Sequence, residues 1–350
     1  MTPARTFAQA LADEVLVLDG GLSNQLEAQG CDLSDALWSA RLLADAPEQI
    51  TAAHTAYVRA GARVLITGSY QATFEGFARR GLSHTEAAEL LTRSIALARA
   101  AAGDEREKGE KGEDEGERGG HGGGERVGGV GEGEGEGEGA PPPSLEDAGR
   151  GKVWVAASVG PYGATLPGGG EYRGRYGLSV RELVAFHRPR VEVLAAAGPD
   201  VLALETVPDA VEAEALLRAV EGCGVPVWLS YTVAGGRTRA GQDLTEAFAV
   251  AAGNGQVVAV GVNCCEPAEA GDAVAAAVAA TGLPAVVYPN SGEHWDAGAR
   301  DWRGTSAYGP AAAPALAAAW ARAGARLIGG CCRVGPETIA ALAERNGPGV

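Results

Sequence analysis

Eight short apolar segments recur along this 350-residue chain, and a helix-like segment follows each of them. The apolar segments are rich in Val, Ile, Leu and Ala and lack the polar alternation of a half-exposed strand, so they predict buried parallel strands. They lie at 15–19, 63–67, 153–158, 201–205, 225–231, 257–263, 285–289 and 326–330.

The helical patterns lie at 47–60, 83–101, 180–196, 209–220, 244–252, 266–280, 311–323 and 336–345. Ser83 and Glu86 form a capping box at the start of the second pattern. Eight strand–helix pairs are the number found in a (β/α)8 TIM barrel, and a doubly wound open sheet is the competing α/β arrangement. We favour the barrel because no phosphate-binding glycine turn follows the first strand.

A low-complexity insert separates the second helix from the third strand. Residues 103–150 are mainly Gly and charged side chains, and 104–147 hold fifteen acidic and five basic residues, so −10 of the net charge of −16 lies here. Such a segment has too little apolar surface to fold and is expected to be disordered. It therefore interrupts a single barrel domain, 1–350, in a loop at the face opposite the catalytic loops.

Charge and hydropathy exclude several classes of protein. An acidic chain is a poor partner for nucleic acid, no apolar run is long enough to span a membrane, and the first residues do not resemble a secretory signal. We therefore expect a cytoplasmic protein, and the oligomeric state stays open. Six cysteines in such a chain are expected to be reduced.

Polar residues stand at the carboxyl ends of six predicted strands, where a barrel builds its active site. They are Asp19, Thr67, Glu205, Asn263 with Cys264, Asn290, and Cys331 with Cys332.

Three of these residues predict a metal site. The sixth and eighth strands lie two apart around a barrel, so Cys264 can meet Cys331 and Cys332 above it. Zinc binds thiolates tetrahedrally, and a catalytic zinc keeps one position open for substrate. Glycines before Cys331 are expected to permit the sharp turn that two adjacent ligands need.

Other interpretations of the cysteines stay open. A zinc hydrolase would use the open position for water, although it favours His and carboxylate ligands. A purely structural zinc would need a fourth protein ligand, for which His294 is the only nearby candidate. Cys31 and Cys223 are expected to be small hydrophobic residues, and Cys265 is expected to point away from the site.

Asp19 and Glu205 have two interpretations. A carboxylate at a strand end commonly caps the next helix. Two carboxylates that face one pocket would instead bind the ammonium group of an amino acid, which is the interpretation we favour.

Several stretches resemble the homocysteine S-methyltransferase family, in particular its small single-domain members with sulfonium donors. They are VLDGGLSNQLEAQG, DLSDALWSARLL, ITGSYQATFEGF, SVGPYGA, EYRGRYG, DVLALETVPDAVEAEAL, VGVNCCEP, YPNSGEHWD and LIGGCCR. Together they run from residue 15 to about 342 and leave out only the insert. The combination of GVNC with GGCC is the specific signal.

The resemblance implies a (β/α)8 barrel, zinc held by Cys264, Cys331 and Cys332, and homocysteine held through its amino group by Asp19 and Glu205. It implies methyl transfer from S-methylmethionine or S-adenosylmethionine to a zinc-bound homocysteine thiolate, giving methionine. Relatives also use selenocysteine and other acceptors. Betaine is a poor donor candidate, because Thr206 stands where the betaine-using members have tyrosine.

Overall fold

A computed structural model describes residues 5–33, 37–103, 151–166, 170–296 and 301–345. They form one compact unit, drawn from Met1–Asp104 and Lys152–Val350. The insert predicted at 103–150 lies, apart from Gly103, outside the described residues.

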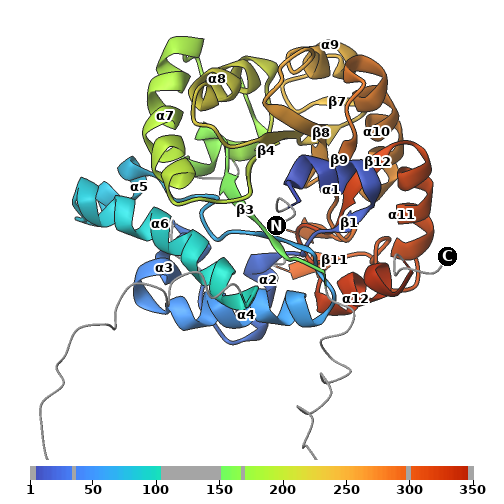
Figure 1. Cartoon of the computed structure of the whole chain (residues 1–350), viewed down its shortest axis with the longest axis horizontal. Helices are drawn as coiled ribbons and strands as arrows, with labels where there is room; N and C mark the ends of the chain where they lie inside the picture. Colours follow the sequence, from blue (N-terminus) through green and yellow to red (C-terminus); the bar gives the residue numbers. More distant parts are fainter. Residues whose placement is uncertain (1–4, 34–36, 104–150, 167–169, 297–300, 346–350) are drawn as a thin grey trace, which may run out of the picture. The chain divides into compact units, whose positions relative to one another are not determined.

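The strands of the main sheet close into a barrel (Figure 1). In sheet order they are β1 (Leu16–Val17), β12 (Ala325–Ile328), β9 (Ala285–Tyr288), β8 (Val257–Asn263), β5 (Val227–Tyr231), β4 (Val201–Val207), β3 (Trp154–Val159) and β2 (Val64–Ile66). All are parallel, and a bridge from Leu18 to Val64 joins the last strand to the first. The eight predicted strands and the TIM barrel are therefore confirmed, and the open sheet is excluded.

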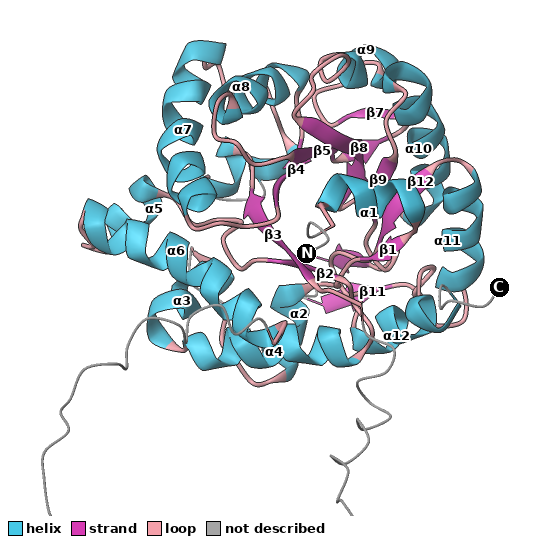
Figure 2. Cartoon of the chain, viewed as in Figure 1, coloured by secondary structure: helices cyan, strands magenta, loops and turns pink. Residues whose placement is uncertain are grey.

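The predicted helices surround the strands (Figure 2). They are α4 (Pro47–Arg59), α6 (His84–Ala101), α7 (Val180–Ala196), α8 (Ala210–Val220), α9 (Leu244–Ala249), α10 (Pro267–Thr281), α11 (Ala313–Arg322) and α12 (Pro336–Arg345). Helix α6 begins with the predicted capping box, in which Ser83 accepts from the backbone of Glu86 and the Glu86 carboxylate accepts from the backbone of Ser83.

Short elements in the connections were not predicted. They are α1 (Phe7–Asp13), α2 (Leu22–Ala28), α3 (Leu42–Asp45), α5 (Phe74–Arg79), the 3-10 turns η1 (Trp38–Arg41), η2 (Tyr162–Thr165) and η3 (Gly170–Tyr172), and the hairpins β6 (Val233–Ala234) with β7 (Arg237–Thr238) and β10 (His294–Asp296) with β11 (Asp301–Arg303). Most are too short to show a period of their own in the sequence.

Helix α1 closes one end of the barrel. Its residues Phe7, Ala10 and Leu11 are buried in the same cluster as the inward-facing side chains of the strands, including Trp154 and Trp228. The Phe7 ring meets Trp154 edge to face, with centroids 5.4 Å apart. Because α1 immediately precedes β1, it seals the amino-terminal end and leaves the carboxyl ends of the strands for the site.

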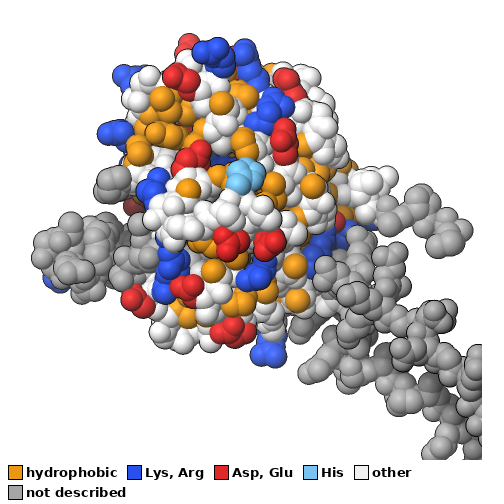
Figure 3. Space-filling view, turned by 90° about the vertical axis from the view of Figure 1, so that its left-hand side faces the viewer, with side chains coloured by type: hydrophobic (Ala, Val, Ile, Leu, Met, Phe, Trp, Pro, Cys, Tyr) orange, Lys and Arg blue, Asp and Glu red, His pale blue; other side chains and the backbone are white. Residues whose placement is uncertain are grey.

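The surface carries charges of both signs. On the face in Figure 3, acidic and basic side chains are interspersed, and Val211 is the only large hydrophobic residue that is exposed in the described part of the chain. Within that part, no helix is both long and apolar enough to cross a bilayer. The cytoplasmic location stays a prediction.

The described segments before and after residues 104–150 are joined by one carboxylate. Asp200, just before β4, accepts from Arg99 near the end of α6 (2.6 Å) and from Lys152 just before β3 (2.9 Å). It also accepts from the backbone of Val155 (2.8 Å). Asp200 thus ties the end of α6 to the start of β3, at the face away from the carboxyl ends of the strands.

Phe7→Ala is expected to lower the free energy of unfolding by about 3–5 kcal/mol, because it leaves a cavity between two tryptophan rings. Phe7→Leu keeps most of the volume and should cost less than about 1.5 kcal/mol. Denaturant titration of the three proteins measures both effects. Equal stability of Phe7→Ala and wild type would show that α1 does not seal the barrel.

Deletion of 104–147 is expected to preserve the fold and activity. It leaves four residues, 148–151, to join two segments that already meet at Asp200, and a shorter loop lowers the entropy of the unfolded chain, worth roughly 1–2 kcal/mol. Thermal unfolding and an activity assay check this result. Loss of activity with an intact fold would place the insert in the catalytic machinery.

Candidate functional site

Three cysteine side chains meet at the carboxyl end of the barrel. Cys264 follows β8, and Cys331 and Cys332 follow β12, with β9 between the two strands. Their sulfur atoms all lie within 4.8 Å of one another. Hydrogen bonds from the other two thiols lower the pKa of Cys332 well below its ordinary value.

The loop after β9 fixes the adjacent pair. The backbone N–H of Cys331 donates to Pro289 O (2.8 Å), and that of Cys332 donates to Asn290 Oδ1 (3.2 Å). Cys332 O accepts from the backbone of Ser291 (3.0 Å). Asn290, which was noted at a strand end, therefore orients a cysteine through its backbone.

The turn that aims the cysteines differs from the one expected. Gly329 and Gly330 are absent from the residues with positive φ, whereas Cys264 has φ 49° and Arg333 has φ 63°. The glycines serve close approach instead, because a Cβ on Gly329 would lie 2.5 Å from Leu18 Cβ and one on Gly330 would lie 2.1 Å from Val334 Cγ1. The backbone strain is at the site itself, on Cys264.

Asp19 lies at the seam where the barrel closes. Its Oδ2 accepts from the backbone of Ile66 (2.8 Å), and its backbone O accepts from Gly330 (3.1 Å). Its Oδ1 is buried and has no hydrogen-bond partner in the described structure. Burial, and to a smaller extent the charge of Glu205, raises the pKa of Asp19 well above its usual range. A cationic group is the natural partner for such an atom.

Glu205, in β4, is the second buried carboxylate. Ser158 donates to its Oε1, and Tyr288 donates to its Oε2 from 2.9 Å. Burial raises its pKa to about 7. Because the charge of Glu205 raises the pKa of Asp19, the two carboxylates are near enough to suit one shared positive ligand.

Hydrogen bonds between Thr206 and Asn263 connect the strand that carries Glu205 to the strand that precedes Cys264. Thr206 follows Glu205 and has φ 57°, which is strained for a β-branched residue. Asn263, which precedes Cys264, accepts from the backbone of Thr206 (2.7 Å) and donates to its hydroxyl (2.7 Å). Glu205, which precedes Thr206, and Cys264, which follows Asn263, are thus held at a fixed separation.

The remaining cysteines lie elsewhere. Cys265 is buried in the outer core between strands and helices, and Cys31 and Cys223 pack against that core. This placement agrees with their interpretation as small hydrophobic residues. The side chain of His294 lies outside the described residues.

Glu171 and Tyr172 are site residues that the sequence analysis did not single out. Both belong to η3, in the loop that joins β3 to α7. The charge of Cys264, followed by burial, raises the pKa of Tyr172 well above its usual range. Burial and the charge of Cys332 raise the pKa of Glu171. The sequence signal that could have pointed to them is the length of this loop, about twenty residues on the catalytic face.

A buried network anchors the same loop. His187 donates from Nε2 to Glu212 (2.9 Å) and accepts at Nδ1 from Arg190 (2.7 Å), which also donates to Gly160 O. Glu212 accepts from the backbone of Tyr162. Burial lowers the pKa of His187, so its neutral ring bridges Arg190 and Glu212.

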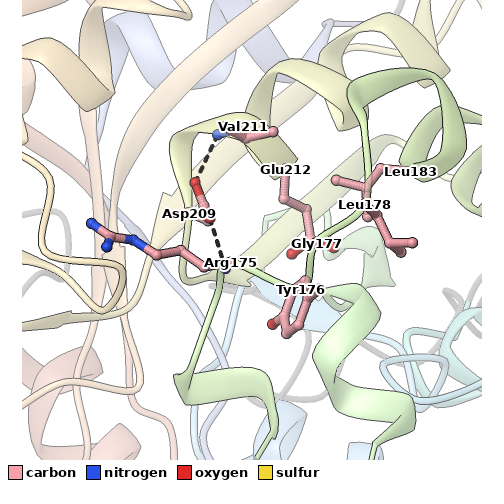
Figure 4. A pocket seen from close by; sticks show the side chains of 8 residues that line it. All are labelled: Arg175, Tyr176, Gly177, Leu178, Leu183, Asp209, Val211 and Glu212. Atoms are coloured by element: carbon pink, nitrogen blue, oxygen red, sulfur yellow. Dashed lines mark hydrogen bonds between the residues drawn. The ribbon is translucent and has the colours of Figure 1, made fainter.

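A pocket of about 260 Å³ lies beside this network (Figure 4). Residues 175–178, Leu183 and the start of α8 line it. Asp209 spans one wall, accepting from the backbones of Arg175 (2.9 Å) and Val211 (3.0 Å). None of the three clustered cysteines lines this pocket, so its chemistry is separate from theirs.

The cysteine cluster is a candidate metal site. Three thiolates around one tetrahedral zinc lie about 3.8 Å apart, given zinc–sulfur bonds of about 2.3 Å. The observed cluster, with all sulfur atoms within 4.8 Å, needs only a small contraction to reach that spacing. Among the described residues the cluster comprises three sulfur ligands, which fit a soft metal with an open position.

Comparison with known proteins gives one family. The family model described as homocysteine S-methyltransferase matches residues 16–346. The Escherichia coli (strain K12) homocysteine S-methyltransferase is 41% identical over 342 residues, which cover 97% of this chain and 98% of that relative. The Bacillus subtilis (strain 168) homocysteine S-methyltransferase YbgG is 39% identical, covering 94% of this chain and 93% of that relative.

A solved structure agrees. The metallated form of the Escherichia coli homocysteine methyltransferase MmuM aligns with a TM-score of 0.76 and 39% identity, over 96% of this chain and 99% of that chain. The resemblance found in the sequence motifs is therefore confirmed. The chain belongs to the homocysteine S-methyltransferase family, and it is a methyltransferase.

Proposed function

We propose that this enzyme transfers a methyl group from a sulfonium donor, S-methylmethionine or S-adenosylmethionine, to the sulfur of homocysteine, forming methionine. The observation that carries the proposal is the cluster of three thiols beside two buried carboxylates at the open end of the barrel. In an acceptor that has both a thiol and an ammonium group, the thiol matches the cysteine cluster and the ammonium group matches the carboxylates.

Cys264, Cys331 and Cys332 would hold a zinc ion. When bound, zinc lowers the pKa of a coordinated thiol, so homocysteine is present as the nucleophilic thiolate at neutral pH. The metallated form of the MmuM relative supports a metal here. The three-sulfur ligand set supports zinc over metals that prefer oxygen.

Asp19 and Glu205 would bind the ammonium group of homocysteine. Asp19 offers a buried oxygen without a partner, and Glu205 is held in place by Ser158 and Tyr288. Since Asn263 and Thr206 fix the carboxylate relative to Cys264, the amino end and the sulfur end of the substrate are positioned together. Such alignment supplies much of the rate of a two-substrate reaction.

The transfer balances without an added base. The homocysteine sulfur forms a bond to the methyl carbon, the bond from that carbon to the sulfonium sulfur breaks, and a neutral thioether leaves. The zinc-hydrolase alternative has no support, because the clustered ligand atoms are three sulfurs rather than imidazole or carboxylate.

Cys331→Ala is expected to lower bound zinc to well under one ion per chain and methyl transfer by more than about 100-fold, because a ligand is lost. Metal analysis and a methionine-formation assay measure the two. Cys265→Ala is the matched control, since Cys265 is adjacent to a proposed ligand but buried in the outer core. Full zinc and activity in Cys331→Ala would exclude the proposed ligand set.

Glu205→Gln is expected to raise the KM for homocysteine roughly 10–100-fold, because it removes a charged hydrogen-bond acceptor for the ammonium group. The comparison acceptor is 4-mercaptobutanoate, which lacks that group and should be used equally by variant and wild type. Steady-state kinetics with both acceptors decide the role. An equal loss for both would mean that Glu205 maintains the site without binding the ammonium group.

A further inference from the structure

The turn η3 is held rigidly at the edge of the site. Gly170 is buried against Gly163, and a Cβ at Gly170 would lie 2.6 Å from Gly163 O. The Tyr176 hydroxyl donates to Gly170 O from 3.0 Å. The turn also contacts η2 and β4, the strand that carries Glu205. Glu171 and Tyr172 therefore occupy defined positions.

The ring of Tyr172 has the properties of a cation site. It is partly exposed and lies within the electrostatic field of all three clustered cysteines. The guanidinium of Arg239 already lies over the ring, with Cζ 5.0 Å from the centroid. An aromatic face attracts cations through its quadrupole, and sulfonium is a cation without hydrogen-bond donors, which depends on such a face.

Glu171 adds an uncompensated negative charge. It is half-buried, lies in the field of Cys332 and Tyr70, and forms no ion pair in the part of the chain that the structure describes. Glu171 directly precedes Tyr172 in η3, so both residues belong to one turn. A partly buried charge of this kind is stabilised by an arriving cation.

We propose that Glu171 and Tyr172 form the part of the methyl-donor subsite that recognises the positive sulfur. The ring receives the sulfonium and its methyl groups, and the carboxylate balances the charge. The inference rests on the proposed function and names residues that make the site select a cationic donor over a neutral one.

Tyr70 is less suited to this task. Its ring packs on Gly160, where an added Cβ would lie 2.7 Å from ring atoms. The Tyr70 ring therefore packs on the backbone after β3, whereas the Tyr172 ring already attracts a cation to its face.

The test compares a charged donor with its uncharged isostere. S-Methylmethionine is the donor, and 2-amino-5-methylhexanoate, in which CH replaces the positive sulfur, is the competitive inhibitor. Both are measured with the zinc-loaded full chain at saturating homocysteine. The ratio of the inhibitor's Ki to the donor's KM reports the preference for positive charge at matched shape.

Tyr172→Leu is expected to lower this ratio about tenfold. Tyr172→Phe keeps the ring and should stay within about threefold of wild type. Glu171→Gln, an isosteric change, should lower the ratio roughly fivefold. The KM for homocysteine and the zinc content should stay at wild-type values in all three, which separates donor recognition from a structural defect.

Two negative results are distinguishable. If wild type forms no methionine from either sulfonium donor, the proposed function is wrong. If wild type does so but the ratio is unchanged in both Tyr172→Leu and Glu171→Gln, only the donor subsite is wrong. Should Tyr172→Leu fail to fold, Glu171→Gln alone decides.

Discussion

The site depends on the close approach of two backbones at the seam of the barrel. The loop after β1 and the loop after β12 meet where Gly330 donates to Asp19 O (3.1 Å) and Gly21 donates to Val334 O (3.0 Å). Side chains larger than hydrogen do not fit there, since a Cβ at Gly20 would lie 2.2 Å from Val334 O and one at Gly21 would lie 2.6 Å from Cys331 O. The contact that closes the barrel therefore also brings Asp19 beside Cys331.

Strain at the site is supported by hydrogen bonds rather than relieved. Thr206 and Cys264 both have positive φ. Asn263 is hydrogen-bonded to Thr206 and directly precedes Cys264. Asn263 is fully buried and also accepts from Ser230 (2.8 Å). Since surrounding contacts over-determine these two backbones, the site is organised before a substrate arrives, which favours catalysis by positioning.

The sequence predicted the strands and the strand-end residues well, because buried parallel strands are continuous apolar runs and their ends are abrupt. Cys264 and Cys331 are examples: their placement required only the strand count and the order of strands around a barrel. Phe7 in α1 was missed because a seven-residue helix has too few turns to show periodicity. Tyr172 was missed because irregular loop structure depends on long-range contacts, such as that of Gly170 with Gly163.

Gly329 and Gly330 also show that the sequence does not reveal which contacts a residue makes in the fold. Two glycines before two cysteines suggested freedom of φ, but neither has a positive φ. The need for glycine comes from Leu18, which is distant in sequence, and from Val334, whose side chain the turn brings against Gly330. The residue type was read correctly as a backbone requirement, and the partner that imposes it appears only in the fold.

In the proposed reaction, the negative charge of the site favours binding of the substrates over binding of the products. Asp19, Glu171 and Glu205 stand with three cysteines, and the guanidinium of Arg239 lies over the ring of Tyr172. Before transfer, a sulfonium donor is attracted by this negative field. Transfer combines one positive sulfur and one negative sulfur into two neutral thioethers, so the products lose that attraction. The same charges that gather the substrates therefore favour release of the donor's thioether, and a neutral analogue of the donor lacks the attraction from the start.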